Sequence, residues 1–197
     1  FEMQAHGIAA ISADAPMQPM AFERRHIEAG DVAIKIDYCG VCHSDLHIAK
    51  NDWGMTNYPI VLGHEIVGEV TAVGDAVTKF AVGDKVAVGC LVDSCQSCKP
   101  CDKGLEQYCT TGYIGTINGA DKRGGITQGG FSDNIVVREE FVLRLKDDFC
   151  GPEVAPLLCA GVTTYSALRH WKAGAGTRVG VIGLGGLGHV AVKLAKA

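Results

Sequence analysis

The stretch GHEIVGEVTAVGDAV, residues 63–77, is the part of the sequence that decides the fold. Its apolar and polar residues alternate as in a half-buried strand, and a Gly-Asp pair marks the turn that follows. The pattern recurs in DVAIKIDY (31–38) and FAVGDKVAVGC (80–90), and FSDNIVVREEFVLRL (131–145) supplies one or two further strands. The first ~150 residues are therefore predicted to form a twisted β-barrel or a set of short sheets.

Composition narrows the class of protein. The chain has 197 residues and a formal net charge of -4, without a run of basic residues, so nucleic acid is not an expected partner. No stretch approaches the roughly 18 apolar residues of a membrane helix, and the N-terminus does not have the pattern of a signal peptide. No membrane association and a cytoplasmic location are therefore expected. The 26 glycines favour a turn-rich β fold over a helical bundle.

Toward its end the sequence takes on the pattern of helices and a buried strand. Residues 151–171 carry apolar side chains at helical spacing, and TRVGVIGLG (177–185) is apolar on both faces, as a strand of a parallel sheet is. The run GLGGLG (183–188) then opens a helix, which is the strand–turn–helix context of a dinucleotide-binding domain. We expect two domains, 1–152 and 153–197, the second being only the start of a Rossmann domain.

Four cysteines lie close together in CQSCKPCDKGLEQYC. Their gaps of two, two and seven residues suit a closed, structural zinc site formed by Cys95, Cys98, Cys101 and Cys109. Two disulfides are one alternative, which the tight spacing and the missing secretory signal disfavour. An iron–sulfur cluster is the other, because C-x₂-C-x₂-C also begins the ferredoxin pattern. The long gap before Cys109, without a proline after it, disfavours that cluster.

A second set of metal-binding residue types is spread along the chain. Cys42, His64 and Cys159 could form a Cys₂His site whose fourth position stays open, as in a catalytic zinc site. Taken singly, each has an ordinary interpretation as a small core residue, a turn histidine or a buried helix residue. Three further cysteines carry no expected role and are predicted to be small buried residues: Cys39, Cys90 and Cys150.

The run G-H-E-x₂-G-x₅-G-x₂-V fits residues 63–77 without a gap, and in this signature the sequence resembles the zinc-containing medium-chain alcohol dehydrogenases. The resemblance extends to YCGVCHSDLH, to the four-cysteine segment, to APLLCAGVTTYSALRHW and to GLGGLGH, and it covers essentially the whole chain. Within the family it is strongest for the cinnamyl-alcohol dehydrogenase and aldehyde reductase branch. It implies a mainly β GroES-like catalytic domain with a zinc lobe, followed by the incomplete start of an α/β Rossmann domain.

The resemblance also implies two zinc ions per chain. One is the structural zinc of the four-cysteine segment. The other is a catalytic zinc held by Cys42, His64 and Cys159, with Glu65 as an alternative ligand. Asp45 matches the carboxylate that orients a ligand histidine in this family.

A proton relay and a cofactor site follow from the same resemblance. Ser44 matches the hydroxyl that exchanges a proton with the bound alcohol, and His47 matches the outer end of the relay. NADP(H) is expected rather than NAD(H) on the branch alone, because the residue that reads the ribose would lie about 20 positions past the glycines, beyond Ala197. Cofactor contacts are implied for His43, Thr163, Gly183, Gly185, Gly186, Leu187 and Gly188.

These observations predict a zinc-dependent oxidoreductase that interconverts primary alcohols and aldehydes by hydride transfer with NADP(H). A small aldehyde or alcohol is the expected substrate, and a homodimer is the expected full-length form. The alternative is a non-redox zinc-stabilised domain, or a fragment that is inactive because its cofactor domain is absent. A zinc-free quinone reductase is a weaker alternative, since such a protein would lack the four-cysteine segment. The chain is expected to be a truncated piece of a longer enzyme, ahead of a proteolytic fragment or a genuine short form.

Overall fold

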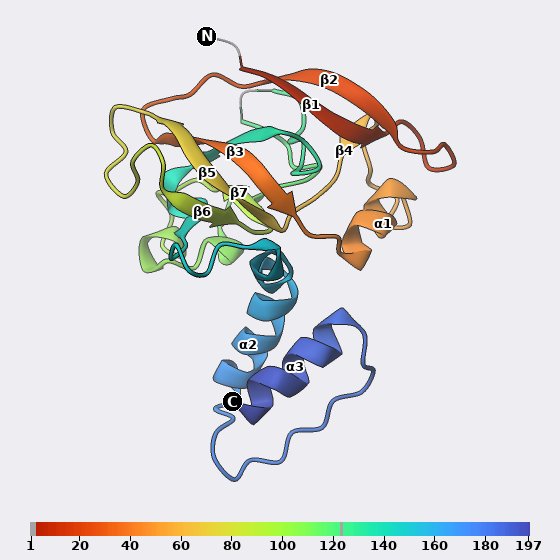
Figure 1. Ribbon diagram of the computed structural model, residues 1–197, viewed down its shortest axis with the longest axis vertical. Coiled ribbons are helices and arrows are strands. Elements are labelled where there is room, and N and C mark those ends of the chain that lie inside the picture. The colour runs from red at the N-terminus through yellow and green to blue at the C-terminus, as the bar shows by residue number, and fades with distance from the viewer. Residues whose placement is uncertain (1–2, 123) are drawn as a thin grey trace.

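A curled five-stranded antiparallel sheet dominates the computed structural model, which describes residues 3–122 and 124–197 (Figure 1). Its strand order is β10-β6-β5-β3-β9. In that order the strands are Val142–Arg144, Lys85–Val88, Ile66–Val73, Asp31–Cys39 and Asn134–Arg138. The alternating segments 31–38 and 63–77 thus form the neighbouring strands β3 and β5, as predicted, and 131–145 supplies two strands.

Two smaller sheets complete the β structure of the described residues. One has the order β2-β1-β4, with β1 at Met3–Ala10, β2 at Gln18–Arg24 and β4 at Ile60–Val61. The other pairs β7 (Leu91–Asp93) with β8 (Ile114–Gly115). The prediction of a set of short sheets is therefore confirmed, and the mainly β class of the first part with it.

The core lies on the inner face of the large sheet. Alternate residues of β3 and β5 point inward, so that Val32, Ile34, Ile66 and Val70 are all fully buried. Burial of each such side chain contributes on the order of 1.5–3 kcal/mol relative to exposure in water. This packing fixes the register of β3 and β5, and the register decides where the ends of the two strands lie.

The same register brings two distant pieces of sequence together at one edge of the sheet. β3 and β5 are antiparallel, and their last and first residues, Cys39 and Ile66, pair with each other. The residues just after β3 therefore lie beside those just before β5. The first group begins helix α1 (His43–Ala49), which is capped by Cys42, and the second contains His64.

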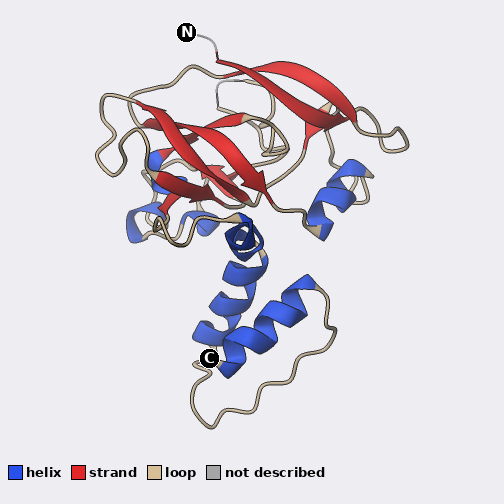
Figure 2. Ribbon diagram, viewed as in Figure 1, coloured by secondary structure: helices blue, strands red, loops and turns tan. Residues whose placement is uncertain are grey.

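The last part of the chain consists of helices and one long loop between them, as Figure 2 shows. A 3₁₀ segment, η4, covers Pro152–Leu158 and is followed by α2 (Ala160–His170) and α3 (Gly186–Lys196), which pack against each other. The helix expected within 151–171 is confirmed from Ala160 onward. Before that point Pro156 lies inside the 3₁₀ turns, where its missing N–H prevents a regular α-helix.

The strand expected over 177–185 is not formed, and this prediction was wrong. Residues 177–184 have no regular structure, and Ile182 is fully exposed at 104% relative accessibility. A strand persists only when neighbours accept its backbone hydrogen bonds, and no described strand lies beside this segment. Among the described residues, this segment does not have the burial that its apolar pattern predicts.

The turn before α3 nevertheless needs its glycines. Gly183 has φ +86°, in the region that favours glycine, and a Cβ on Gly188 would lie only 1.9 Å from the Gly183 carbonyl oxygen. The helix expected after this turn is confirmed as α3. Within residues 3–122 and 124–197, none of the helices has the length and apolar character to cross a bilayer.

Candidate metal centres

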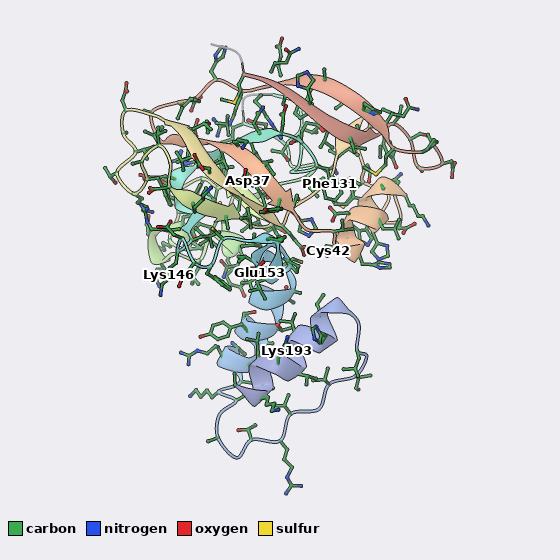
Figure 3. All side chains as sticks on the ribbon, viewed as in Figure 1. Asp37, Cys42, Phe131, Lys146, Glu153 and Lys193 are labelled. Carbon is green, nitrogen blue, oxygen red and sulfur yellow. The ribbon has the colours of Figure 1, made fainter. Side chains whose placement is uncertain are left out.

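The first candidate centre lies at the edge where β3, β5 and α2 meet. Its four residues are Cys42, His64, Glu65 and Cys159, and one possible ligand atom from each lies within 4.8 Å of those of the others. Figure 3 labels Cys42 between the end of β3 and the top of α2. Cys159 reaches this place because it ends the 3₁₀ segment η4 and caps α2.

The distance between the two thiols of the first centre suits a shared metal ion. The Sγ atoms of Cys42 and Cys159 are 3.7 Å apart. Two sulfurs bound tetrahedrally at about 2.3 Å from one zinc ion are about 3.8 Å apart, whereas a disulfide requires about 2.05 Å. The pair is therefore spaced as two ligands of one ion.

Asp45 holds the backbone and the imidazole of this centre in place. Its side chain is buried, with the residue only 2% exposed. Oδ2 accepts a hydrogen bond from the Cys42 N–H at 2.8 Å, and Oδ1 accepts one from the Gly63 N–H at 2.9 Å. Oδ1 also lies 3.2 Å from His64 Nδ1. Because a carboxylate only accepts, the proton sits on Nδ1 and leaves Nε2 free to bind a metal ion.

The pKa of His64 reflects this partner. Burial alone would lower it, but the hydrogen bonds and charges of Asp45 and Cys42 together outweigh burial and raise the pKa of His64 to about 9. The carboxylate therefore makes the imidazole a more basic ligand.

We expect Asp45→Asn to weaken metal binding at the first centre selectively. The amide keeps the size of the side chain but loses the charge that orients His64, and loss of such a partner typically costs about 10–100-fold in metal affinity. Chelator competition with the zinc-loaded chain measures the effect. Asp37→Asn, at an exposed position on β3, is the matched control and should leave both centres unchanged. Equal zinc affinities of Asp45→Asn and the unmodified chain would contradict this role.

Glu65 provides an independent indication that the first centre suits a cation. It is 3% exposed, and its Oε2 atom is buried without a hydrogen-bond partner among the described residues. Burial raises the pKa of Glu65. A buried carboxylate oxygen normally has a partner, so an orphaned one beside two thiols and an imidazole fits a metal ion.

The expected relay residues lie on α1 beside this centre. Ser44 Oγ is 3.7 Å from Cys42 Sγ, and His47 follows one helical turn later. His47 Nδ1 lies 2.8 Å from Asp52 Oδ2, and its ring contacts that of Trp53, which is 52% exposed. His47 is thus fixed in orientation, and of the two expected relay residues, Ser44 and His47, it is the one farther from the thiol of Cys42.

The expected cofactor residues are placed on surfaces rather than in the metal centre. His43 is exposed and its ring lies 4.7 Å from that of His47. Thr163 is exposed on α2, and its N–H donates to the Cys159 carbonyl one turn before it. The glycine turn from Gly183 to Gly188 lies at the start of α3. Across the described parts of the chain, no hydrogen bond or ion pair joins this turn to the metal-binding residues.

The second candidate centre is the four-cysteine segment. The possible ligand atoms of Cys95, Cys98, Cys101 and Cys109 also lie within 4.8 Å of one another. The Sγ of Cys101 is 3.4 Å from that of Cys98 and 3.9 Å from that of Cys95, again near the edge length of a zinc tetrahedron. Two short 3₁₀ turns, η1 (Cys101–Lys103) and η2 (Glu106–Tyr108), bring Cys109 back to the other three.

This geometry favours a metal ion over the two alternatives considered for the segment. All nine cysteines are free, so the two disulfides considered above are not formed. An iron–sulfur cluster would place several irons and sulfides between the thiolates and would spread them further apart. Hydrogen bonds from the backbone and side chain of Ser97 also lower the pKa of Cys95 to about 5, which favours the thiolate that binds metal.

Some residues around the centres were missed from the sequence. Ser94 Oγ lies 3.3 Å from Cys101 Sγ, and Thr111 Oγ1 lies 3.4 Å from Cys109 Sγ, so these hydroxyls can donate to thiolates. A hydroxyl residue within two positions of a ligand cysteine is the signal that could have found them. Cys90 was predicted to be buried, but it is exposed, and its thiol contacts that of Cys159. Cys39 and Cys150 are half-buried.

Comparison with known proteins agrees with this geometry. A family model described as the alcohol dehydrogenase GroES-like domain matches residues 28–147. NADP-dependent alcohol dehydrogenase C 1 of Mycolicibacterium smegmatis is 58% identical over 190 residues, which are 96% of this chain and 54% of that protein. Aldehyde reductase YahK of Escherichia coli is 53% identical over 201 residues, which are 99% of this chain and 56% of that protein.

A solved structure shows the same similarity in three dimensions. The cinnamyl alcohol dehydrogenase SbCAD4 of Sorghum bicolor superposes with a TM-score of 0.94 at 49% identity, covering 98% of this chain and 56% of that one. The chain thus spans about half the length of the curated relatives it matches.

Proposed function

Because the chain belongs to the alcohol dehydrogenase GroES-like family, we propose that it provides the zinc centre of an oxidoreductase that interconverts primary alcohols and aldehydes with NADP(H). One observation carries the proposal: two thiols, an imidazole and an orphaned buried carboxylate converge at the first centre. Three of these donors hold zinc and leave one position for substrate. The NADP-dependent M. smegmatis relative and the E. coli aldehyde reductase support the cofactor and the substrate class.

The residues of the first centre hold and orient the metal. Cys42 and Cys159 contribute thiolates, His64 contributes Nε2, and Asp45 fixes the imidazole through Nδ1. Glu65 is an alternative ligand when the substrate position is free, which gives its unpartnered oxygen a role. When bound, zinc polarises the oxygen of the substrate, and the nicotinamide exchanges a hydride with the carbon that carries it.

The proton of the reaction moves along α1. In aldehyde reduction the Ser44 hydroxyl donates a proton to the oxygen that becomes the alcohol, and in the reverse direction it accepts one. His47 exchanges that proton with solvent, because an imidazole can both accept and donate a proton. The carboxylate of Asp52 holds Nδ1 of His47 and leaves Nε2 for the exchange.

We expect Ser44→Ala to slow turnover without loss of metal. Removing the hydroxyl interrupts proton transfer, and such a step contributes about 10²–10⁴-fold to the rate. Steady-state kcat for aldehyde reduction, measured beside the zinc content, separates the two effects. Ser166→Ala, at an exposed position on α2, is the matched control. An unchanged kcat would remove Ser44 from the proposed relay.

The cofactor site is proposed to join the two parts of the chain. The N-terminus of α3, with Gly183, Gly185, Gly186, Leu187 and Gly188, provides backbone N–H groups for the cofactor pyrophosphate. His43 contributes a further pyrophosphate contact, and Thr163 lies beside the nicotinamide. Exposure of both side chains supports their availability to a ligand.

The remaining proposals concern the domain boundary, the oligomeric state and the location of the protein. A domain boundary near residue 152 is supported by the end of the last strand at Arg144 and the start of η4 at Pro152. A homodimer is proposed from the family resemblance alone. A cytoplasmic location is supported by nine free cysteines, which suit a reducing compartment.

Cobalt substitution tests the proposed function directly on this chain. We expect two Co²⁺ ions to bind and imidazole to shift the visible bands of the first centre only, because only that centre has an open position. In a second assay, NADPH and an aromatic aldehyde should give loss of nicotinamide absorbance. Two ions without a band shift and without NADPH oxidation would instead support a non-redox zinc-stabilised domain.

A further inference from the structure

A segment remote in sequence from the first centre braces the backbone that carries His64. Residues 128–132, here called the strap, run beside residues 61–64. The N–H groups of Gly129, Gly130 and Phe131 donate to the carbonyls of Val61, Gly63 and Leu62, at 2.7, 2.8 and 2.8 Å. The strap therefore follows the chain up to the residue before the metal-binding imidazole.

The contact between the strap and residues 61–64 is close, and it includes the side chain of Gln128. Gln128 Oε1 accepts a hydrogen bond from the Val61 N–H at 2.6 Å. A Cβ on Gly129 would lie 2.4 Å from the Leu62 carbonyl oxygen, so only glycine allows the two backbones to approach this far. A displacement of the strap must consequently displace residues 61–64 as well.

Arg24, the last residue of β2, holds the other side of the strap. It is only 9% exposed. Its Nη1 donates to the Gln128 carbonyl at 2.5 Å, and its Nη2 donates to the Gly129 carbonyl at 3.0 Å and to Ser132 Oγ at 2.8 Å. Its Nε donates to the Asn134 carbonyl at 3.0 Å. The planar guanidinium thus satisfies several acceptors at once, which an ammonium on a flexible stem does not do.

We infer that Arg24 is a positioning residue for the first metal centre: through the strap it fixes the backbone on which His64 is presented. The chain of contacts runs from the guanidinium to the strap carbonyls, from the strap N–H groups to residues 61–63, and from Gly63 to His64. Asp45 completes the arrangement, because it binds the Gly63 N–H and His64 Nδ1 with the same oxygen. The inference rests on the proposed zinc site at Cys42, His64 and Cys159.

Zinc affinity of each centre, measured by chelator competition and by the separate Co²⁺ bands, tests the inference. We expect Arg24→Met to weaken zinc binding at the first centre by about 10-fold, the lower end of the loss caused by removing a direct partner of a ligand, and to leave the four-cysteine centre unchanged. Arg24→Lys keeps a positively charged group but loses the planar guanidinium, and it should show a smaller loss at the same centre. Arg144→Met, which removes an exposed arginine of β10, is the matched control.

A double-mutant cycle separates positioning from general stability. Gln128→Ala removes the side-chain hydrogen bond from the strap to Val61 and keeps the backbone carbonyl that Arg24 binds. The fold loss of zinc affinity in the double variant with Arg24→Lys should therefore be smaller than the product of the fold losses in the two single variants. Unchanged affinity at the first centre in both Arg24 variants, or equal loss at both centres, would overturn the inference. Absence of metal from the first centre of the unmodified chain would overturn the proposed function instead.

Discussion

Replacing His64 by alanine is expected to remove one of two zinc ions and to lower kcat/KM for aldehyde reduction by about 10³-fold or more. The imidazole is one of the three proposed donors at the first centre and is the one that Asp45 orients. A bound metal ion stabilises developing charge on oxygen by several kcal/mol, and each 1.36 kcal/mol corresponds to a factor of ten. Native mass spectrometry gives the zinc count, and NADPH oxidation with an aromatic aldehyde gives the rate.

The variant His170→Ala controls for the loss of a histidine as such. His170 is exposed at the end of α2 and belongs to neither centre. We expect it to retain two ions and the full rate. If His64→Ala retained both ions with unchanged affinity, the first centre would not be a metal site of the kind proposed.

The second large effect is expected from Cys101→Ser. Cys101 is buried, and its sulfur lies close to those of Cys98 and Cys95. Its replacement therefore removes one of the four proposed zinc ligands at a buried position. Structural zinc binding in small domains is worth about 10–16 kcal/mol in total, and we expect roughly 4 kcal/mol of folding stability to be lost with the ion. For a chain of this size that corresponds to a fall of roughly 8–16 °C in thermal midpoint.

Calorimetry together with zinc analysis measures this effect. Cys150→Ser, a half-buried cysteine outside both centres, is the matched control and should leave the midpoint within a few degrees. The first centre should keep its ion in Cys101→Ser wherever the chain remains folded. A variant with two ions and an unchanged midpoint would show that the four-cysteine segment is not closed around a metal.

Local sequence patterns predicted those features whose causes are local. Alternation located β3 and β5, because a strand with one buried face repeats every two residues. The spacing of the four cysteines predicted that their thiols lie together, since all four candidate ligands of the second centre come from one short segment. The helix α3 followed from the glycine turn before it.

Features that depend on distant partners could not be derived in this way. Cys42 and Cys159 are 117 positions apart, and only the family resemblance joined them into one site. The strap contacts of Arg24 span more than a hundred positions and involve backbone carbonyls. Because every residue has a backbone carbonyl, the sequence does not show which of them Arg24 binds. The strand expected at 177–185 failed for the related reason that its apolar faces require neighbours in a sheet.

X-ray absorption at the zinc edge tests the central claim most directly, because it counts the ligands of the bound ions. With two ions per chain, six cysteine sulfurs are shared between the centres, so we predict an average of three sulfurs per zinc at about 2.3 Å, with the rest of the shell from nitrogen and oxygen. The His64→Ala chain should show one ion with four sulfurs. A single ion with an all-sulfur shell in the unmodified chain would contradict the account.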